Sequence, residues 1–192
     1  CFYFLTLFTK LNVTKIENGT GIMAEMSVIF TWPGISFTLS RRVLDIVKDR
    51  IDLNDVKSVI YYRMCQLLHN GVTGDWPDDL NFDHDLIDQN LEIGEFLITS
   101  NLYEWNGFLY IARGDFHAAH EAVQKLSDIG EAYDNDWSNM IKYYLNTFLL
   151  TKCRKSDEAM EEAEKAIQFM SSKSSFRMYL ICIYSYKARV QI

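Results

Sequence analysis

The sequence predicts an all-α fold in which antiparallel helix pairs recur about every forty residues. A Gly-Asp-Trp tripeptide at residues 74–76 recurs as Gly-Asp-Phe at 114–116, and the same step reaches Gly34 and Arg154. A fixed period of this length is typical of stacked repeat arrays. Apart from residues 13–21, no stretch alternates as a strand does or carries hairpin dipeptides, which favours helices throughout.

Apolar residues place one amphipathic helix in each step. After Gly114 they follow three or four positions apart, which puts them on one helical face, at Phe116, Ala119, Val123, Leu126, Gly130 and Tyr133. The same offsets recur at Ala159, Ala163, Ala166 and Met170, and at Leu39, Val43 and Ile46. In the remaining step Pro77 and its polar neighbours favour a loop, so we expect that helix from about Asp83 to Ser100.

Each of these helices has a predicted partner before it, over roughly 54–70, 102–113, 137–154 and 175–192. Side-chain oxygens that could cap free backbone amides stand at Asp115, Asp136, Ser156 and Ser174 or Ser175. The resulting pairs cover 1–50, 52–100, 101–134, 136–171 and, incompletely, 175–192, within a single domain of residues 1–192. Because the chain begins without Met and ends without a helix stop signal, we expect a fragment of a longer protein.

The unit around Gly107 resembles the tetratricopeptide repeat. Gly107 and Tyr110 match the G-x2-Y of that family's first helix, and Ala119 fits the alanine of its second helix. The small residues Gly107 and Ala119 would let two helix backbones approach closely. In the next unit the pattern is matched by Ala159 and Ala166. The period exceeds the family's value of about 34 and no proline closes the pairs, so the chain resembles a divergent member. The resemblance implies an α-solenoid, which is a right-handed superhelix of antiparallel helix pairs.

The long repeats and residues 132–136 look most like helical arrays in large bacterial signalling proteins. In those proteins the array follows an ATPase domain and sometimes accompanies a nucleotide cyclase. We therefore expect a protein-interaction or sensory module of a larger cytoplasmic signalling or regulatory protein. Its partner would be a peptide, another protein or a neighbouring domain of the same chain. The alternatives are a structural spacer or an oligomerisation array without a peptide groove, and an all-α enzyme.

Charge and composition narrow the classes of partner. The formal net charge of −7 argues against nucleic acid, because phosphate contacts need clustered Lys and Arg. The apolar residues 1–8 are too few to span a bilayer and follow no basic residue, so we expect a buried helix and no membrane segment. The widely spaced cysteines favour a reducing cytoplasm. Residues 64–112 contain no Lys or Arg, so their acidic side chains could attract a basic partner or form a solvated face.

Two motifs contain residues that could hold a cation. His117 and His120 lie three positions apart on a predicted helix beside Glu121, but two histidines do not complete a metal site. Residues 79–85 begin like a calcium loop, yet His84 stands at the glycine position and Asn90 replaces the final glutamate. No catalytic or nucleotide-binding motif is present. We therefore expect a protein that is not an enzyme and that carries no cofactor or metal.

The concave wall of the array is the remaining candidate site. In the family that the chain resembles, one face of the first helix of each pair lines this wall. The corresponding positions here are Tyr61, Met64, Leu68, Asn101, Glu104, Phe108, Tyr144, Phe148, Lys152 and Tyr184. Such a mainly aromatic and apolar wall suits an amphipathic helix or an extended hydrophobic segment. The same residues could instead pack between the repeats.

Overall fold

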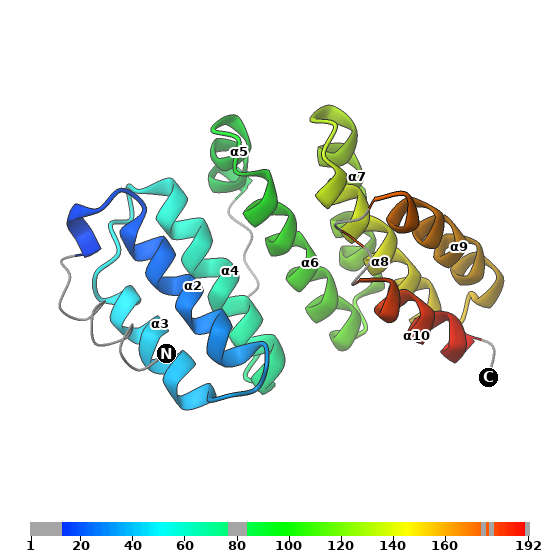
Figure 1. Ribbon diagram of the computed structural model, residues 1–192, viewed down its shortest axis with the longest axis horizontal. Helices are drawn as coiled ribbons and strands as arrows, with labels where there is room; N and C mark the ends of the chain where they lie inside the picture. Colours follow the sequence, from blue (N-terminus) through cyan, green and yellow to red (C-terminus); the bar gives the residue numbers. More distant parts are fainter. Residues whose placement is uncertain (1–12, 77–83, 174–175, 177–178, 191–192) are drawn as a thin grey trace. The chain divides into compact units, whose positions relative to one another are not determined.

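The computed structural model describes residues 13–76, 84–173, 176 and 179–190, and all of its regular structure is helical (Figure 1). These residues form one short 3-10 helix and nine α-helices, without a strand, which confirms the all-α prediction. Contacts between Cα atoms group the chain into two compact units, residues 1–102 and 103–192, where the sequence analysis treats it as one domain. The boundary falls inside helix α6 (Phe96–Arg113).

The first unit contains the 3-10 helix η1 and the helices α2 to α5, with bounds Val13–Lys15, Gly19–Thr31, Phe37–Lys48, Val56–Thr73 and His84–Glu92. Helix α2 packs against both α3 and α4, and α4 also contacts α3 and α5. Side chains from these helices bury one another almost completely, among them Met23, Val43, Val47 and Ile60. The core of this unit therefore lies between α2, α3 and α4.

The second unit contains the end of α6 and the helices α7 to α10, with bounds Phe116–Ala132, Asp136–Lys152, Ser156–Ser172 and Leu180–Val190. Helix α8 packs against α7, α9 and α10, and α9 also contacts α10. The predicted alanine positions are completely buried, at Ala119, Ala159, Ala163 and Ala166. Phe116 and Tyr133, at the two ends of the predicted stripe, are exposed.

The forty-residue step corresponds to a recurring backbone conformation. Residues with φ of 68°, 77°, 80° and 59° lie in the turns after α2, α4, α6 and α8, at Gly34, Gly74, Gly114 and Arg154. Two further residues forty positions apart also have positive φ, after α5 and α7, at Gly94 and Asp134. Glycine adopts this left-handed conformation without steric cost, which is why it often ends helices. The repeated tripeptide therefore marks equivalent turns.

Replacing Gly114 with alanine should lower the free energy of unfolding by about 1 kcal/mol, because a Cβ disfavours the left-handed conformation. Apart from its own chain neighbours, no described residue has an atom within 4 Å of the position that this Cβ would take, so the effect arises in the backbone. The reciprocal change, Arg154→Gly, should raise the free energy of unfolding. Urea unfolding followed by circular dichroism measures both, and a Gly114→Ala protein of unchanged stability would contradict this role of the turn.

Side-chain caps begin several of the helices. Asp115 accepts a hydrogen bond from the backbone amide of Ala118 at 3.1 Å, which confirms its predicted role. The prediction for Asp136 is wrong, because Asn135 caps α8 by accepting from the Ser138 amide at 2.9 Å. Ser156 is the first residue of α9 and not its cap. Ser174 and Ser175 lie outside the described residues.

The prediction of one helix from about Asp83 to Ser100 is wrong. Helix α5 ends at Glu92 and α6 begins at Phe96. Between them Gly94 has φ 83°, and the amide of Glu95 donates to the carbonyl of Asn90 at 2.9 Å, a typical helix-ending turn. The apolar spacing continues across this turn, so periodicity alone could not reveal it. As a result α6 is longer than the predicted helix at 102–113.

Candidate partner-binding surface

Aromatic side chains of α6, α8 and α10 form a continuous cluster in the second unit, which we call the aromatic wall. Its members are half-buried, and they are Trp105, Phe108, Tyr144, Phe148 and Tyr186. The ring centroid of Phe108 lies 5.5 Å from those of both Tyr144 and Phe148. The Phe148 ring stacks on Tyr186 at 5.1 Å, and Trp105 lies 5.7 Å from Phe108. Three of the predicted groove residues therefore lie together.

The helices that carry the aromatic wall approach closely at Gly107. A Cβ at this position would stand 2.4 Å from Cδ2 of Leu145, which is completely buried on α8. The missing side chain at Gly107 therefore lets α6 come close enough to α8 for the rings of Phe108 and Tyr144 to meet. This agrees with the predicted role of Gly107 as a small residue between two helices, and the contact with Leu145 identifies α8 as the helix that it faces.

Glu104 places one carboxyl group beside the aromatic wall. It lies four residues before Phe108 on α6, so both side chains share a helical face. Burial raises the pKa of Glu104 to about 8, because an ionised carboxylate loses its hydration there. When ionised, it helps to raise the pKa of Tyr179, after the larger effect of burial, and it contributes least to the raised pKa of Tyr144, after burial, Tyr186 and Cys182.

Two further groove candidates are Lys152 on α8 and Asn101 on α6. Lys152 is exposed near the end of α8, with its Nζ 5.4 Å from the centroid of the Phe148 ring. The ring face of Phe148 is therefore already in contact with a cation. Asn101 is half-buried on α6, within the first unit.

Tyr184 is not the residue of α10 that joins the aromatic wall. Tyr186 takes that place, and its hydroxyl donates a hydrogen bond to the Tyr144 hydroxyl at 3.2 Å. The forty-residue step maps Tyr144 onto Tyr184, but it does not hold here, since α8 begins at Asp136 and α10 at Leu180. Sequence reasoning also missed Trp105, and the only signal for either residue was its aromatic type.

The groove candidates of α4 have different environments from one another. Met64 and Leu68 are only 6% and 3% exposed, so they are core residues of the first unit and do not line a surface. Tyr61 is half-buried, and its hydroxyl donates to Oε2 of Glu95 at 3.2 Å. Burial and the nearby carboxylates of Glu95 and Glu25 raise the pKa of Tyr61 to about 12. Of the three predicted positions, only Tyr61 reaches the surface.

Acidic residues of the stretch without Lys or Arg find basic partners elsewhere in the first unit. Asp75 pairs with Arg41 at 2.6 Å, and Glu95 forms an ion pair with Lys57. Both basic residues come from outside the stretch, and their ion pairs neutralise part of its negative charge. The calcium-like residues 79–83 lie outside the described residues.

The two-histidine motif forms a simple surface pair. His117 Nδ1 lies 3.7 Å from Oε1 of Glu121, and both side chains are largely exposed. Within the described ranges, no three or more His, Cys, Asp and Glu side chains are grouped so that they could hold a metal ion.

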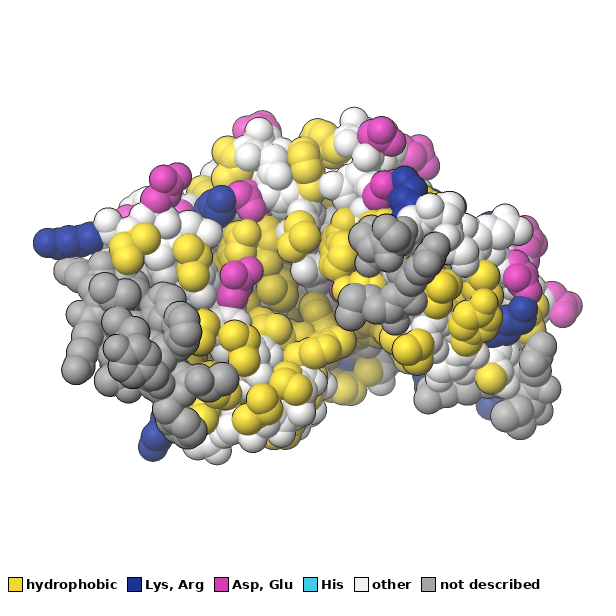
Figure 2. Space-filling view, viewed as in Figure 1, with side chains coloured by type: hydrophobic (Ala, Val, Ile, Leu, Met, Phe, Trp, Pro, Cys, Tyr) yellow, Lys and Arg dark blue, Asp and Glu magenta, His cyan; other side chains and the backbone are white. Residues whose placement is uncertain are grey.

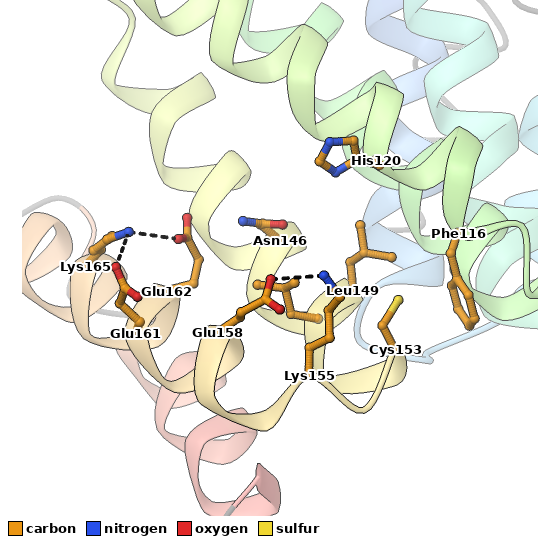
Figure 3. A pocket seen from close by; sticks show the side chains of 11 residues that line it. Phe116, His120, Asn146, Leu149, Cys153, Lys155, Glu158, Glu161, Glu162 and Lys165 are labelled. Carbon is orange, nitrogen blue, oxygen red and sulfur yellow. Dashed lines mark hydrogen bonds and ion pairs between the residues drawn. The ribbon is translucent and has the colours of Figure 1, made fainter.

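A shallow pocket lies on another side of the second unit, between α7, α8 and α9 (Figure 3). Phe116, His120 and Cys153 line one part of it. The charged residues of its other part pair with one another, Lys155 with Glu158 and Lys165 with Glu161 and Glu162 (Figure 3). Because these charges satisfy each other across exposed helix faces, the pocket offers a ligand little unpaired charge.

A buried polar network connects α2, α3 and α4 in the first unit. The Ser40 hydroxyl lies 2.6 Å from the Thr31 hydroxyl and 2.9 Å from Nδ1 of His69. His69 is only 2% exposed, and its Nε2 has no hydrogen-bond partner among the described residues. Burial, with a smaller contribution from the charge of Arg41, lowers the pKa of His69 below 6.5.

Acid should therefore destabilise the first unit through His69. The unfolded chain binds a proton at His69 near pH 6.5, whereas the folded chain binds it only at lower pH. The free energy of unfolding should fall as the pH drops through that interval and level off once both states are protonated. Urea unfolding at several pH values should show a shallower slope for His69→Gln than for the unsubstituted protein. Parallel pH curves would contradict this assignment.

Of the helices in the described part of the chain, none combines the length and the apolar character that crossing a membrane requires. The chain matches no protein-family model, no curated protein and no solved structure.

Proposed function

We propose that this chain is a protein-interaction module whose aromatic wall binds a peptide or a neighbouring domain. The observation that carries the proposal is the accessible cluster of Trp105, Phe108, Tyr144, Phe148 and Tyr186. Aromatic side chains supply much of the binding energy in protein interfaces, and tyrosine and tryptophan add a polar group that can pair with a partner. A row of such rings from three helices suits a helical or extended segment.

The proposed architecture is a divergent tetratricopeptide-like array. The recurring left-handed turns at forty-residue spacing support it, as does the packing of alternate helices, α2 with α4 and α8 with α10. A cytoplasmic location is part of the proposal, favoured by the free thiols of Cys65, Cys153 and Cys182. The bacterial signalling context rests on the sequence resemblance alone.

Peptide selection tests the proposed function. Random peptides displayed on phage would be selected on the 192-residue chain, and the dissociation constants of recovered peptides measured by fluorescence anisotropy. The double substitution Phe108→Ala with Phe148→Ala should weaken binding about thirtyfold or more, as expected for two interface anchors. The matched control, Phe37→Ala with Phe116→Ala, removes two exposed rings outside the aromatic wall and should leave binding unchanged.

The outcome must be read together with the fold of each variant. Circular dichroism should show the same helicity for both double variants before affinities are compared. Unchanged binding by the Phe108→Ala, Phe148→Ala protein would overturn the proposal, as would a failure to recover any binding peptide.

An oligomerisation array is a second candidate, favoured by exposed apolar side chains at two other places. Helix α2 and its C-cap expose Ile22, Ile29 and Trp32, and Figure 2 shows hydrophobic side chains gathered on the face of the first unit that carries α2. Helix α10 exposes Ile181 and Tyr184. Exposed apolar patches commonly mark association sites. Light scattering over a range of protein concentrations decides, because a concentration-independent monomer would exclude self-association.

A further inference from the structure

Glu104 has an unusual combination of surroundings and partners in the second unit. Its side chain is half-buried on the helical face that also presents Phe108, and when ionised it contributes to the raised pKa of Tyr179 and, to a lesser degree, of Tyr144. Its carboxyl group forms no ion pair or hydrogen bond with another described residue, whereas Glu161 and Glu164 on α9 each have a lysine partner. Among the described residues, the carboxyl group of Glu104 beside the aromatic wall therefore has no countercharge.

Burial of the Glu104 carboxyl group indicates which kind of ligand would stabilise its ionised form. A partly buried carboxylate loses hydration that the surrounding rings cannot replace, and burial accordingly raises its pKa. A cation beside it would restore the lost stabilisation and favour the ionised form. An apolar partner would instead remove the remaining water from Glu104 and leave the group unpaired.

The neighbouring rings favour the same kind of ligand. The face of an aromatic ring attracts a cation through its quadrupole. The Lys152 ammonium already uses the Phe148 ring in this way, at 5.4 Å from the centroid. Phe108 follows Glu104 by four residues on α6, and its ring centroid lies 5.5 Å from those of Tyr144 and Phe148. A basic side chain that enters beside Glu104 would thus contact a carboxylate and aromatic rings together.

We propose that the partner of the aromatic wall carries a lysine or arginine that pairs with Glu104, flanked by apolar residues that pack on Phe108, Tyr144 and Phe148. This inference rests on the proposed function, since it names the chemistry of the peptide that the aromatic wall binds. The net charge of −7 on the chain also favours a basic partner over an acidic one. Glu104 would determine which peptides bind, and the rings would supply most of the affinity.

The peptides recovered by selection on the chain provide the probe. They should be enriched in lysine or arginine next to aromatic or aliphatic residues. For the tightest peptide, Glu104→Gln should weaken binding by about tenfold or more, because a charge-assisted hydrogen bond is lost. Replacement of the peptide's basic residue by norleucine should weaken binding to the unsubstituted protein equally. The norleucine peptide should bind the Glu104→Gln protein no more weakly than it binds the unsubstituted one.

Controls separate this inference from the proposed function. Glu131→Gln, on an exposed part of α7, is a matched substitution that should leave affinity unchanged. Peptides without a basic residue, or equal affinity for the Glu104→Gln protein, would overturn the role of Glu104 while loss of binding in the Phe108→Ala, Phe148→Ala protein still supported the aromatic wall. If that double variant kept full affinity, or if no peptide were recovered, both proposals would fail together.

Discussion

Gly107→Ala is expected to lower the free energy of unfolding by about 1–3 kcal/mol, the usual effect of overpacking a dense interior. The new Cβ would stand 2.4 Å from Cδ2 and 3.1 Å from Cδ1 of Leu145. Leu145 is completely buried on α8, so dense packing leaves its side chain little room to rotate away from the new methyl group. Urea unfolding followed by circular dichroism measures the effect, and an unchanged midpoint would show that α6 and α8 are not closely packed at this point.

A double substitution tests whether Leu145 is the residue that Gly107 accommodates. Leu145→Ala alone should cost about 2–5 kcal/mol, because it leaves a cavity in the core. When Leu145→Ala is combined with Gly107→Ala, the new methyl group occupies part of that cavity. The total destabilisation should therefore be smaller than the sum of the two single effects. Strictly additive effects would contradict direct contact between the two positions.

Leu68→Ala should lower the free energy of unfolding by about 2–5 kcal/mol, as expected for a leucine in a well-packed core. The side chain is only 3% exposed on α4, although its register position predicted a place in a binding groove. The matched control is Leu53→Ala in the same unit, where the leucine is 80% exposed. That substitution should change stability by no more than about 0.5 kcal/mol.

Binding measurements on Leu68→Ala separate its two interpretations. A core residue changes stability and affects peptide affinity only through unfolding, so affinity measured well below the unfolding transition should be unchanged. A residue that contacted the peptide directly would show the reverse pattern. Loss of affinity with undiminished stability would restore Leu68 to the candidate surface.

Local features of the fold were predictable because they depend on neighbouring residues. The alanine stripe at Ala119, Ala159 and Ala163 follows helical spacing, and the structure buries each of these residues completely. The turn at Gly114 and the cap at Asp115 follow from the conformational freedom of glycine and the hydrogen-bonding reach of aspartate. The end of α5 was missed, although Gly94 is a turn residue, because apolar spacing continues across it.

The candidate surface was only partly predictable. Register correctly grouped Phe108, Tyr144 and Phe148, since equivalent positions of stacked helices face the same way. It failed for Met64, which packs in the core of the first unit, and for Tyr184, because α8 and α10 do not begin forty residues apart. Which of these positions is buried depends on the helices packed against it, and spacing within one helix cannot show that.

By itself the sequence determined the helical class, the helix faces and the left-handed turns at Gly34, Gly74 and Gly114, since each depends on residues close together in the chain. Only the tertiary structure decided that Tyr186 joins Phe148 and that Glu104 lies beside the rings without a basic partner among the described residues. Burial and charge are created by side chains brought together from α6, α8 and α10, so the chemistry of the candidate surface appears only when those helices pack.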